Sequence, residues 1–346
     1  MTPERGSRSS SAERRAPPRT IYVLSDVHFA SAGEQQRQDH EARAIANPGL
    51  RALVKAYRHF IWLRDPFAHN HLLDAFLARV PVADLVVVNG DLSCDTAFVG
   101  LSDDAACESA RQCLAKLRGQ FGSRLVATLG DHELGKLSLF GGQGGLRLAS
   151  WERLGSLELE PLWRREFGSY VLLGVTSTLL AFPIFEPDSL VGERGRWQAL
   201  REAHLTEIRS AFDWLAPRQR VVLFCHDPTA LPFLWREERV RAKISQIELT
   251  IIGHLHSNLI LWKSRRLAGL PPIRFLGNSV RRMSTALSEA RHWRPFNVRL
   301  CPSLAGLELL KDGGYVELRL DPQASVSVHF ERHQLPRRPA SLPPRA

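Results

Sequence analysis

No stretch of this 346-residue chain approaches the ~18 consecutive apolar residues that a membrane-spanning helix needs. The chain also lacks the basic and then apolar start of a secretory signal, so we expect no targeting segment of that kind. Cysteine is scarce: the five residues are odd in number and form no Cys-x-x-Cys pair. These absences predict reduced thiols and a cytoplasmic protein.

A glycine-rich stretch at 141–145 (GGQGG) lacks the Lys-Ser/Thr that a phosphate-binding P-loop requires. We therefore predict a hinge there, or a loop that passes close to another part of the chain. The sequence contains no internal repeat.

The net charge of +10 is concentrated at the two ends of the chain. Residues 1–19 carry five Arg and two Glu, and residues 331–346 carry four Arg and one Glu, so each segment contributes +3. The body from 20 to 330 retains about +4, which suits an anionic substrate and predicts no specific nucleic-acid partner. Both ends have almost no apolar residues, so we expect disordered tails at 1–19 and 332–346.

Between the tails, strand and helix patterns alternate, which predicts an α/β domain over 20–331 with a helical insertion at about 40–80. Ser102 is the expected N-cap of one helix. Apolar residues at helical spacing predict helices at 50–63, 70–79, 103–118 and 196–215. Further strands are predicted in 163–177, at 273–276, 304–310, 315–320 and 326–330, with a hairpin turn at 312–314.

Five short apolar runs have the composition of buried strands, and each ends directly at Asp, His or a Gly followed by one of them. The runs are 21–25, 85–89, 125–129, 221–225 and 249–252. In open α/β folds, ligands bind at the carboxyl edge of the sheet, so these polar side chains should meet there. The side chains are Asp26, His28, Asp91, Asp131, His132, His226, His254 and His256.

Carboxylates combined with neutral imidazoles suit borderline divalent metals such as manganese, iron, zinc or cobalt. These eight side chains, of which seven are taken as metal ligands, exceed the needs of one ion, so the set predicts two divalent ions that share a carboxylate. Two such ions at ~3.5–4 Å can clamp a phosphoryl group and generate hydroxide at neutral pH.

The order of these motifs resembles the calcineurin-like metallophosphoesterases, whose signature is Asp-x-His, Gly-Asp, Gly-Asn-His-Asp/Glu, a lone His and Gly-His-x-His. This chain has DVH at 26–28, GD at 90–91, GDHE at 130–133, His226 and GHLH at 253–256. The resemblance covers about 21 to 330. It implies a four-layer α/β-β/α sandwich of two mixed sheets flanked by helices.

The same resemblance implies a role for each residue. Asp91 would bridge the two metals, His132 would contact the phosphate and protonate the leaving oxygen, and Glu133 would accept the other N–H of His132. The first metal would be held by Asp26, His28 and His256, and the second by Asp131, His226 and His254. The implied activity is hydrolysis of a phosphomonoester, phosphodiester or diphosphate by metal-activated hydroxide.

Two departures from the family pattern are informative. Asp131 stands where the family has Asn, which keeps an oxygen ligand but adds a negative charge. Either the substitution is simply tolerated, or the added charge gives tighter metal binding and weaker attraction of a phosphate dianion. The second motif continues as Leu92-Ser93-Cys94-Asp95-Thr96 rather than Gly-Asp-x-Val-Asp-Arg-Gly, which counts against a protein phosphatase.

Two basic segments are candidates for choosing the substrate. Residues 42–64 contain five Lys or Arg, no acid and several aromatics. Within them, 50–64 is compatible with a lid over an anionic amphiphile, a peripheral membrane contact, or an ordinary packed helix. Arg281 and Arg282 belong to a second cluster, predicted to bind a distal phosphate of the substrate.

Two classes of function are compatible with these features. The first is a hydrolase acting on a phosphorylated small molecule or lipid. The second is a catalytically idle scaffold of the same fold that binds partners. Scaffolds lose metal ligands, whereas this chain has every ligand position, which favours the enzyme.

Overall fold

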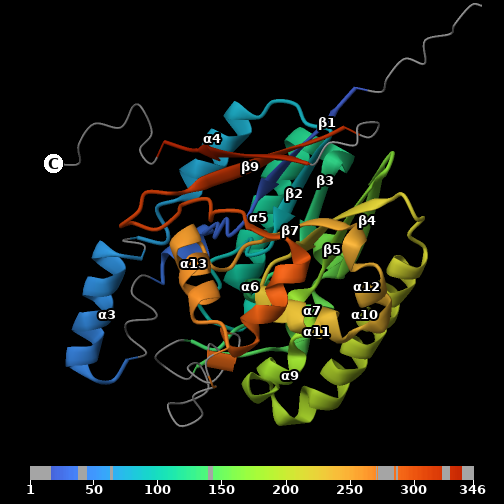
Figure 1. Cartoon of the computed structure of the whole chain (residues 1–346). Helices are drawn as coiled ribbons and strands as arrows, with labels where there is room; N and C mark the ends of the chain where they lie inside the picture. Colours follow the sequence, from blue (N-terminus) through green and yellow to red (C-terminus); the bar gives the residue numbers. More distant parts are fainter. Residues whose placement is uncertain are drawn as a thin grey trace, which may run out of the picture.

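The computed structural model describes residues 17–37, 45–62, 65–138, 143–269, 271, 284–285, 287–321 and 328–336. Two five-stranded sheets pack face to face with helices on their outer sides (Figure 1). This is the two-sheet α/β sandwich that the sequence predicts. The strand orders are β10-β9-β1-β2-β3 and β4-β5-β6-β7-β8.

The strands are β1 (Arg19–Leu24), β2 (Leu85–Asn89), β3 (Leu125–Thr128), β4 (Leu162–Phe167), β5 (Tyr170–Val175), β6 (Arg220–Cys225), β7 (Ile247–Ile252), β8 (Val298–Leu300), β9 (Gly314–Leu320) and β10 (His329–Gln334). In the first sheet β1, β2 and β3 are parallel, and β9 runs antiparallel to β1. In the second, β5 to β8 are parallel and β4 is antiparallel. Parallel strands end at the same edge of their sheet, so β1, β2 and β3 present their polar tips at one edge of the first sheet, and β6 and β7 present theirs at one edge of the second.

Alternation along the strands divides the core into two parts. Val87 belongs to the cluster between the sheets, together with Leu172 and Phe224 of the second sheet. Val86 and Val88 face the opposite way and join a cluster that also includes helix residues. The strands are therefore apolar on both faces, as expected for sheets covered on both sides.

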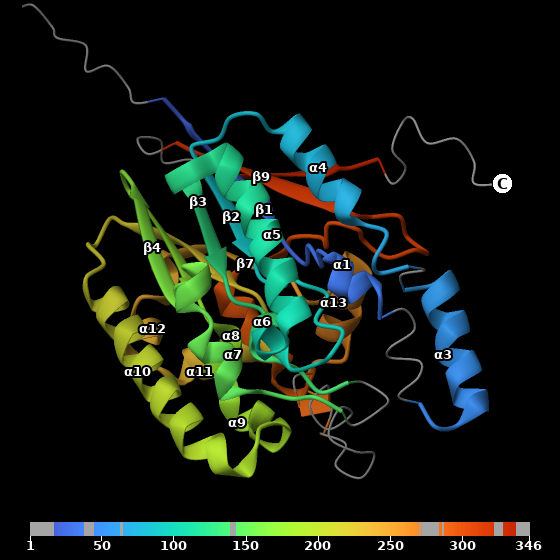
Figure 2. The same cartoon turned by 180° about the vertical axis from the view of Figure 1, so that it is seen from behind.

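The α-helices are α1 (Ala32–Gln35), α3 (Pro48–Phe60), α4 (Asn70–Arg79), α5 (Asp104–Phe121), α6 (Asp131–Leu134), α7 (Leu148–Glu152), α8 (Ser177–Leu180), α9 (Phe182–Phe185), α10 (Arg194–Asp213), α11 (Leu231–Arg236), α12 (Glu238–Ala242) and α13 (Asn258–Arg266). Helices α4 and α5 lie along the first sheet, and α10 to α12 lie by the second (Figure 2). Eight short 3-10 turns complete the described elements.

The four helix predictions are confirmed; the ends of 70–79 are as predicted, and those of the other three are shifted. Asn47 caps α3 by accepting from Leu50 N, and Pro48 occupies the first turn, where no backbone donor is needed. The cap of α5 was predicted wrongly as Ser102. Asp103 is the N-cap, accepting from the backbone N–H groups of Ala105 and Ala106, because Ser102 is the last residue of a 3-10 turn.

The strand predictions near the C-terminus need correction. Residues 304–310 form no strand, because the loop satisfies its own backbone donors: Leu307 N donates to the Asp312 side chain and Gly306 N donates to Ser303 O. Strand β9 therefore forms no hairpin with residues 304–310 and pairs with β1 and β10. The short β8 was not predicted, and β10 runs to Gln334, past the domain boundary expected at 331. Residues 273–276 lie outside the described part of the chain.

All five cysteines are free thiols, as the sequence predicts. None of the helices in the described part of the chain combines the length and hydrophobicity required to cross a bilayer.

Candidate metal centre

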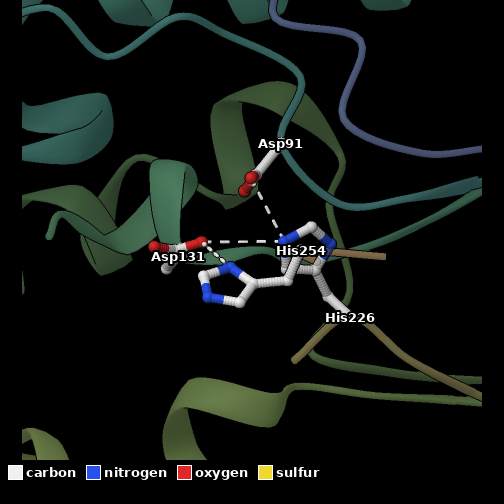
Figure 3. Close-up of side chains that lie close together, drawn as sticks. All are labelled: Asp91, Asp131, His226 and His254. Carbon is white, nitrogen blue, oxygen red and sulfur yellow. Dashed lines mark hydrogen bonds and ion pairs between the residues drawn. The ribbon is translucent and has the colours of Figure 1, made fainter. Parts of the chain in front are cut away.

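The eight predicted side chains come together at the carboxyl edge of the strands. One group brings ligand atoms of Asp91, Asp131, His226 and His254 within 4.8 Å of one another (Figure 3). A second does the same with Asp26, His28 and His256, and a third joins Asp91 to His28 and His132. Asp91 thus lies between the two halves of the site, as expected of a bridging ligand. The division matches the two ligand sets that the family resemblance implies.

The backbone at these tips is held in an unfavourable conformation. A left-handed φ in a residue other than glycine costs about 1 kcal/mol or more, and it persists only where the surroundings impose it. Five of the seven predicted metal ligands adopt it: Asp26 (51°), His28 (48°), Asp91 (59°), His254 (56°) and His256 (56°). Such strain concentrated in one set of loops is typical of a functional site.

Two glycines allow the loops to approach closely. A Cβ at Gly130 would lie 2.1 Å from Oδ1 of Asp91, and a Cβ at Gly253 would lie 1.9 Å from Oγ of Ser25. Any larger residue at either position would displace a loop that carries a predicted ligand. The glycines of the GDHE and GHLH motifs therefore have a steric role.

His226 provides the clearest evidence that this site accommodates a cation. Its Nδ1 lies 2.6 Å from the carbonyl oxygen of Asn89, so this nitrogen carries a proton and donates it. When the ring is neutral, the buried Nε2 presents a lone pair, 3.1 Å from Oδ2 of Asp91 and 3.6 Å from Oδ1 of Asp131. It has no hydrogen-bond partner among the described residues. Three acceptors facing one another in the interior require a positive charge between them, which a metal ion would supply.

The electrostatics of this cluster lead to the same conclusion. Burial alone would lower the pKa of His226, but the carboxylates of Asp91 and Asp131 raise it well above its usual value. Burial would also lower the pKa of His254, but the carboxylates of Asp227 and Asp131 outweigh this effect and raise the pKa to about 9. The cluster binds protons strongly when no other cation is present, so protons and metal ions should compete for it.

The other cluster has neutral imidazoles. Burial lowers the pKa of both His28 and His256, which keeps them in the form that binds metals. Nε2 of His256 lies 3.3 Å from Oδ1 of Asp26, whose carboxylate also accepts hydrogen bonds from His254 N and Ser25 Oγ. Carboxylates and imidazoles without a thiol fit two borderline divalent ions, and the residues present therefore match the predicted cofactor.

His132 lies beside the metal ligands. Its Nε2 is 3.7 Å from Oδ2 of Asp91, and its Nδ1 is 3.1 Å from Ser93 O. Burial lowers the pKa of His132 to about 4, so the ring is neutral near pH 7. The ammonium of Lys136 forms a hydrogen bond with Nε2. His132 is therefore in contact with a lysine that the family motif does not include.

The predicted contact between Glu133 and His132 is wrong. The Glu133 carboxylate accepts the backbone N–H groups of Gly130 (2.7 Å), Asp91 (3.0 Å) and Leu92 (2.7 Å). Adjacent residues of a helix do not face each other, so Glu133 in α6 points toward the β2 tip rather than to the ring of its neighbour. Glu133 consequently joins the loop after β2 to the loop after β3.

Three nearby residues were not found by sequence reasoning. Lys136 follows His132 by four residues, and a helical continuation of the motif would have indicated it. Asp227 directly follows His226, and its Oδ2 lies 3.8 Å from Nε2 of His254. The ring centroid of Trp62 is 4.8 Å from that of His256, a contact without any sequence signal. Arg281 and Arg282 lie outside the described residues, so their role as phosphate ligands stays a prediction.

A sequence profile of calcineurin-like phosphoesterases matches residues 19–258, which include all five motifs. The chain belongs to the calcineurin-like phosphoesterase family. Membership implies a metal-dependent phosphoesterase, and the family typically uses a dinuclear metal site. None of the curated proteins matches the chain at a significant level.

Several solved structures match this calcineurin-like phosphoesterase at low sequence identity. A dimetal phosphatase from Danio rerio is 13% identical, with a TM-score of 0.41 and coverage of 91% of this chain and 99% of that one. A phosphopantetheinyl hydrolase from Mycobacterium tuberculosis is 13% identical (TM-score 0.32; 68% and 83% covered). A purple acid phosphatase from yellow lupin (Lupinus luteus) is 10% identical (TM-score 0.35), and the match covers 70% of this chain but 38% of the lupin chain.

Proposed function

We propose that this protein hydrolyses phosphoric esters with two divalent metal ions held by the two side-chain clusters. The observation that carries the proposal is the position of Asp91, whose carboxylate lies close to His226 and Asp131 on one side and to His28 on the other. When bound, such ions neutralise the charge of a phosphoryl group and lower the pKa of a bound water, so that hydroxide is available at neutral pH. The substrate class is a phosphomonoester, phosphodiester or diphosphate on a small molecule or lipid.

The protein's own residues have separable tasks in this reaction. Lys136 donates a hydrogen bond to Nε2 of the neutral His132 ring beside the Asp91 carboxylate, where the phosphate would lie. A proton passed from this ammonium through Nε2 would reach the leaving oxygen. Because Nδ1 of His132 is held by Ser93 O, Nε2 faces the site. The positive charge of Lys136 also offsets part of the extra negative charge that Asp131 brings.

A hydrolysis screen tests this proposal. The chain would be stripped with a chelator and reloaded separately with manganese, iron, zinc or cobalt. Turnover would then be measured with bis-p-nitrophenyl phosphate, p-nitrophenyl phosphate, nucleotides and lipid diphosphates. We expect at least one metal to restore turnover in the wild type and in Asp74→Asn, an exposed control, and to fail in Asp91→Asn.

The proposal would be overturned if the chain bound metal but hydrolysed none of these substrates with any of the four metals. That result would favour the catalytically idle scaffold, in which the clusters serve structure or partner binding.

A further inference from the structure

Large apolar side chains are exposed mainly in one part of the described molecule. Ten of the fourteen most exposed ones lie in α3 and the residue after it, in α13 and the residue after it, and in the loop before β9. We call this set the docking face. Its members are Leu50, Leu53, Tyr57, Phe60, Ile61, Leu259, Trp262, Leu267, Leu309 and Leu310.

Helix α3 contributes little to the core. Val54 is its one buried residue, whereas Leu53 is 66% exposed and Phe60 is 65% exposed. Leu50, Leu53, Tyr57 and Phe60 recur every three or four residues, so they form a continuous stripe along one side of the helix. In both overall views α3 stands at the margin of the molecule, on the same side as α13 (Figures 1 and 2).

The docking face reaches the metal centre. The chain after α3 is fixed by hydrogen bonds from Glu308 N to Trp62 O (2.8 Å) and from Leu309 N to Ile61 O (3.2 Å). These bonds place the ring of Trp62 against that of His256, a predicted metal ligand. At the other end, α13 begins two residues after His256. A partner bound to the docking face therefore lies next to the two clusters of predicted metal ligands.

The charge of the same helices has one sign. Helix α3 contains Arg51, Lys55 and Arg58 and no acid, and α13 contains Lys and Arg but no acid. On α13 the guanidinium of Arg266 lies 5.1 Å from the ring centre of Trp262, so a cation and an exposed aromatic are adjacent. Basic residues beside exposed aromatic and aliphatic side chains suit the boundary between head groups and acyl chains of an anionic membrane.

We propose that the docking face binds the surface of an anionic lipid bilayer, with Leu53, Phe60 and Trp262 entering the interface. A second copy of this chain fits the face poorly, because a two-fold contact would bring two basic surfaces together. The bound orientation turns the metal centre toward the head-group layer. If the proposed hydrolase activity holds, its substrate is then a phosphate ester presented from that layer; the binding itself does not depend on catalysis.

Sedimentation of the full chain with lipid vesicles tests the proposal. Vesicles of phosphatidylcholine alone would be compared with vesicles that also contain phosphatidylglycerol, at low and high salt and without metal or substrate. We expect binding to the anionic vesicles that weakens as salt rises. Lys263→Gln should weaken it by about fivefold, the effect of one basic residue at a membrane surface.

The decisive variant is Leu53→Ser/Phe60→Ser, matched by Val191→Ser/Trp214→Ser. The control residues are 76% and 77% exposed and lie outside the docking face, Val191 in the 3-10 turn before α10 and Trp214 directly after α10. The α3 variant should weaken vesicle binding by at least about tenfold, and the control should bind like the wild type. All four side chains are exposed, so both variants should keep the wild-type thermal midpoint.

Three results would overturn the proposal: no binding to anionic vesicles, equal binding to neutral ones, or equal losses in the two variants. A dimer in solution that the α3 variant disperses, without vesicle binding, would overturn it in favour of a second copy. Turnover of a soluble ester by the α3 variant separates this proposal from the hydrolase proposal. That turnover should persist when vesicle binding is lost.

Discussion

The backbone N–H of Asp91 donates a hydrogen bond of 3.0 Å to Oε2 of Glu133. The same carboxylate accepts the N–H groups of Gly130 and Leu92. One side chain therefore holds together the loop after β2, which carries the bridging ligand, and the loop after β3, which leads to His132. Glu133 therefore belongs to the architecture of the site rather than to proton transfer.

Replacing Glu133 with alanine should lower the free energy of unfolding by about 2–4 kcal/mol, because three buried backbone donors lose the acceptor that they share. Urea unfolding of the chelator-treated chain would measure this. Glu152→Ala is a matched control, since Glu152 makes an exposed ion pair with Arg196 and should change stability by less than about 1 kcal/mol. Equal losses in the two variants would contradict this role of Glu133.

His204 should make stability depend on pH at a site remote from the metal ligands. Burial lowers the pKa of His204 below 6.5, and its Nε2 accepts the N–H of Thr176. The unfolded chain then binds more protons below pH 6.5, so the contribution of His204 is complete above that pH and is lost as the pH falls. Unfolding free energies at pH 8 and 5.5 should differ less in His204→Gln than in the wild type; an identical difference would contradict the prediction.

His132→Ala should leave both metals bound and slow hydrolysis by roughly 10²–10⁴ for esters with poor leaving groups. The loss should shrink for nitrophenol esters, whose leaving group needs little protonation. Equal losses for both substrate types would instead indicate that His132 positions the phosphate.

Lys136→Met should slow the same esters by about tenfold to a hundredfold, the effect of one charged hydrogen bond. Lys116→Met is the control, because Lys116 pairs with Asp74 at the surface. Metal content should stay at the wild-type level in both. A Lys136 variant with unchanged turnover would show that its contact with His132 has no part in the reaction.

Asp131→Asn restores the residue that the family has at this position and removes a negative charge from one cluster. A unit charge at ~4 Å is worth about 4 kcal/mol at an effective dielectric of 20, before compensating shifts in neighbouring groups. The variant should lose metal to a chelator more readily and should favour dianionic monoesters over monoanionic diesters relative to the wild type. Unchanged metal retention and unchanged preference would mean that Asp131 is only an isosteric replacement.

The strand tips could be predicted from the sequence because each is a local pattern, an apolar run followed directly by Asp or His. Parallel pairing aligns the tips within each sheet, and the packing of the two sheets then brings Asp26 and His256 together although they lie far apart in the sequence. The fold class follows from the same pattern of strands and helices.

Other features depend on contacts that no local pattern encodes. Residues 304–310 resemble a strand in composition, but Asp312 and Ser303 organise them into a loop. Trp62 reaches His256 through backbone pairing with the loop before β9. The direction of Glu133 depends on the single turn of α6, which motif matching does not reveal.

Metal stoichiometry tests the central claim most directly, namely that Asp91 serves two ions. Calorimetric titration of manganese or zinc into the chelator-treated chain should give two ions per chain for the wild type and for Asp74→Asn. The Asp91→Asn variant should bind both ions much more weakly, with turnover lost in parallel, because one shared oxygen donor serves both. A single ion in the wild type, or two ions held as tightly by Asp91→Asn with unchanged turnover, would contradict the account.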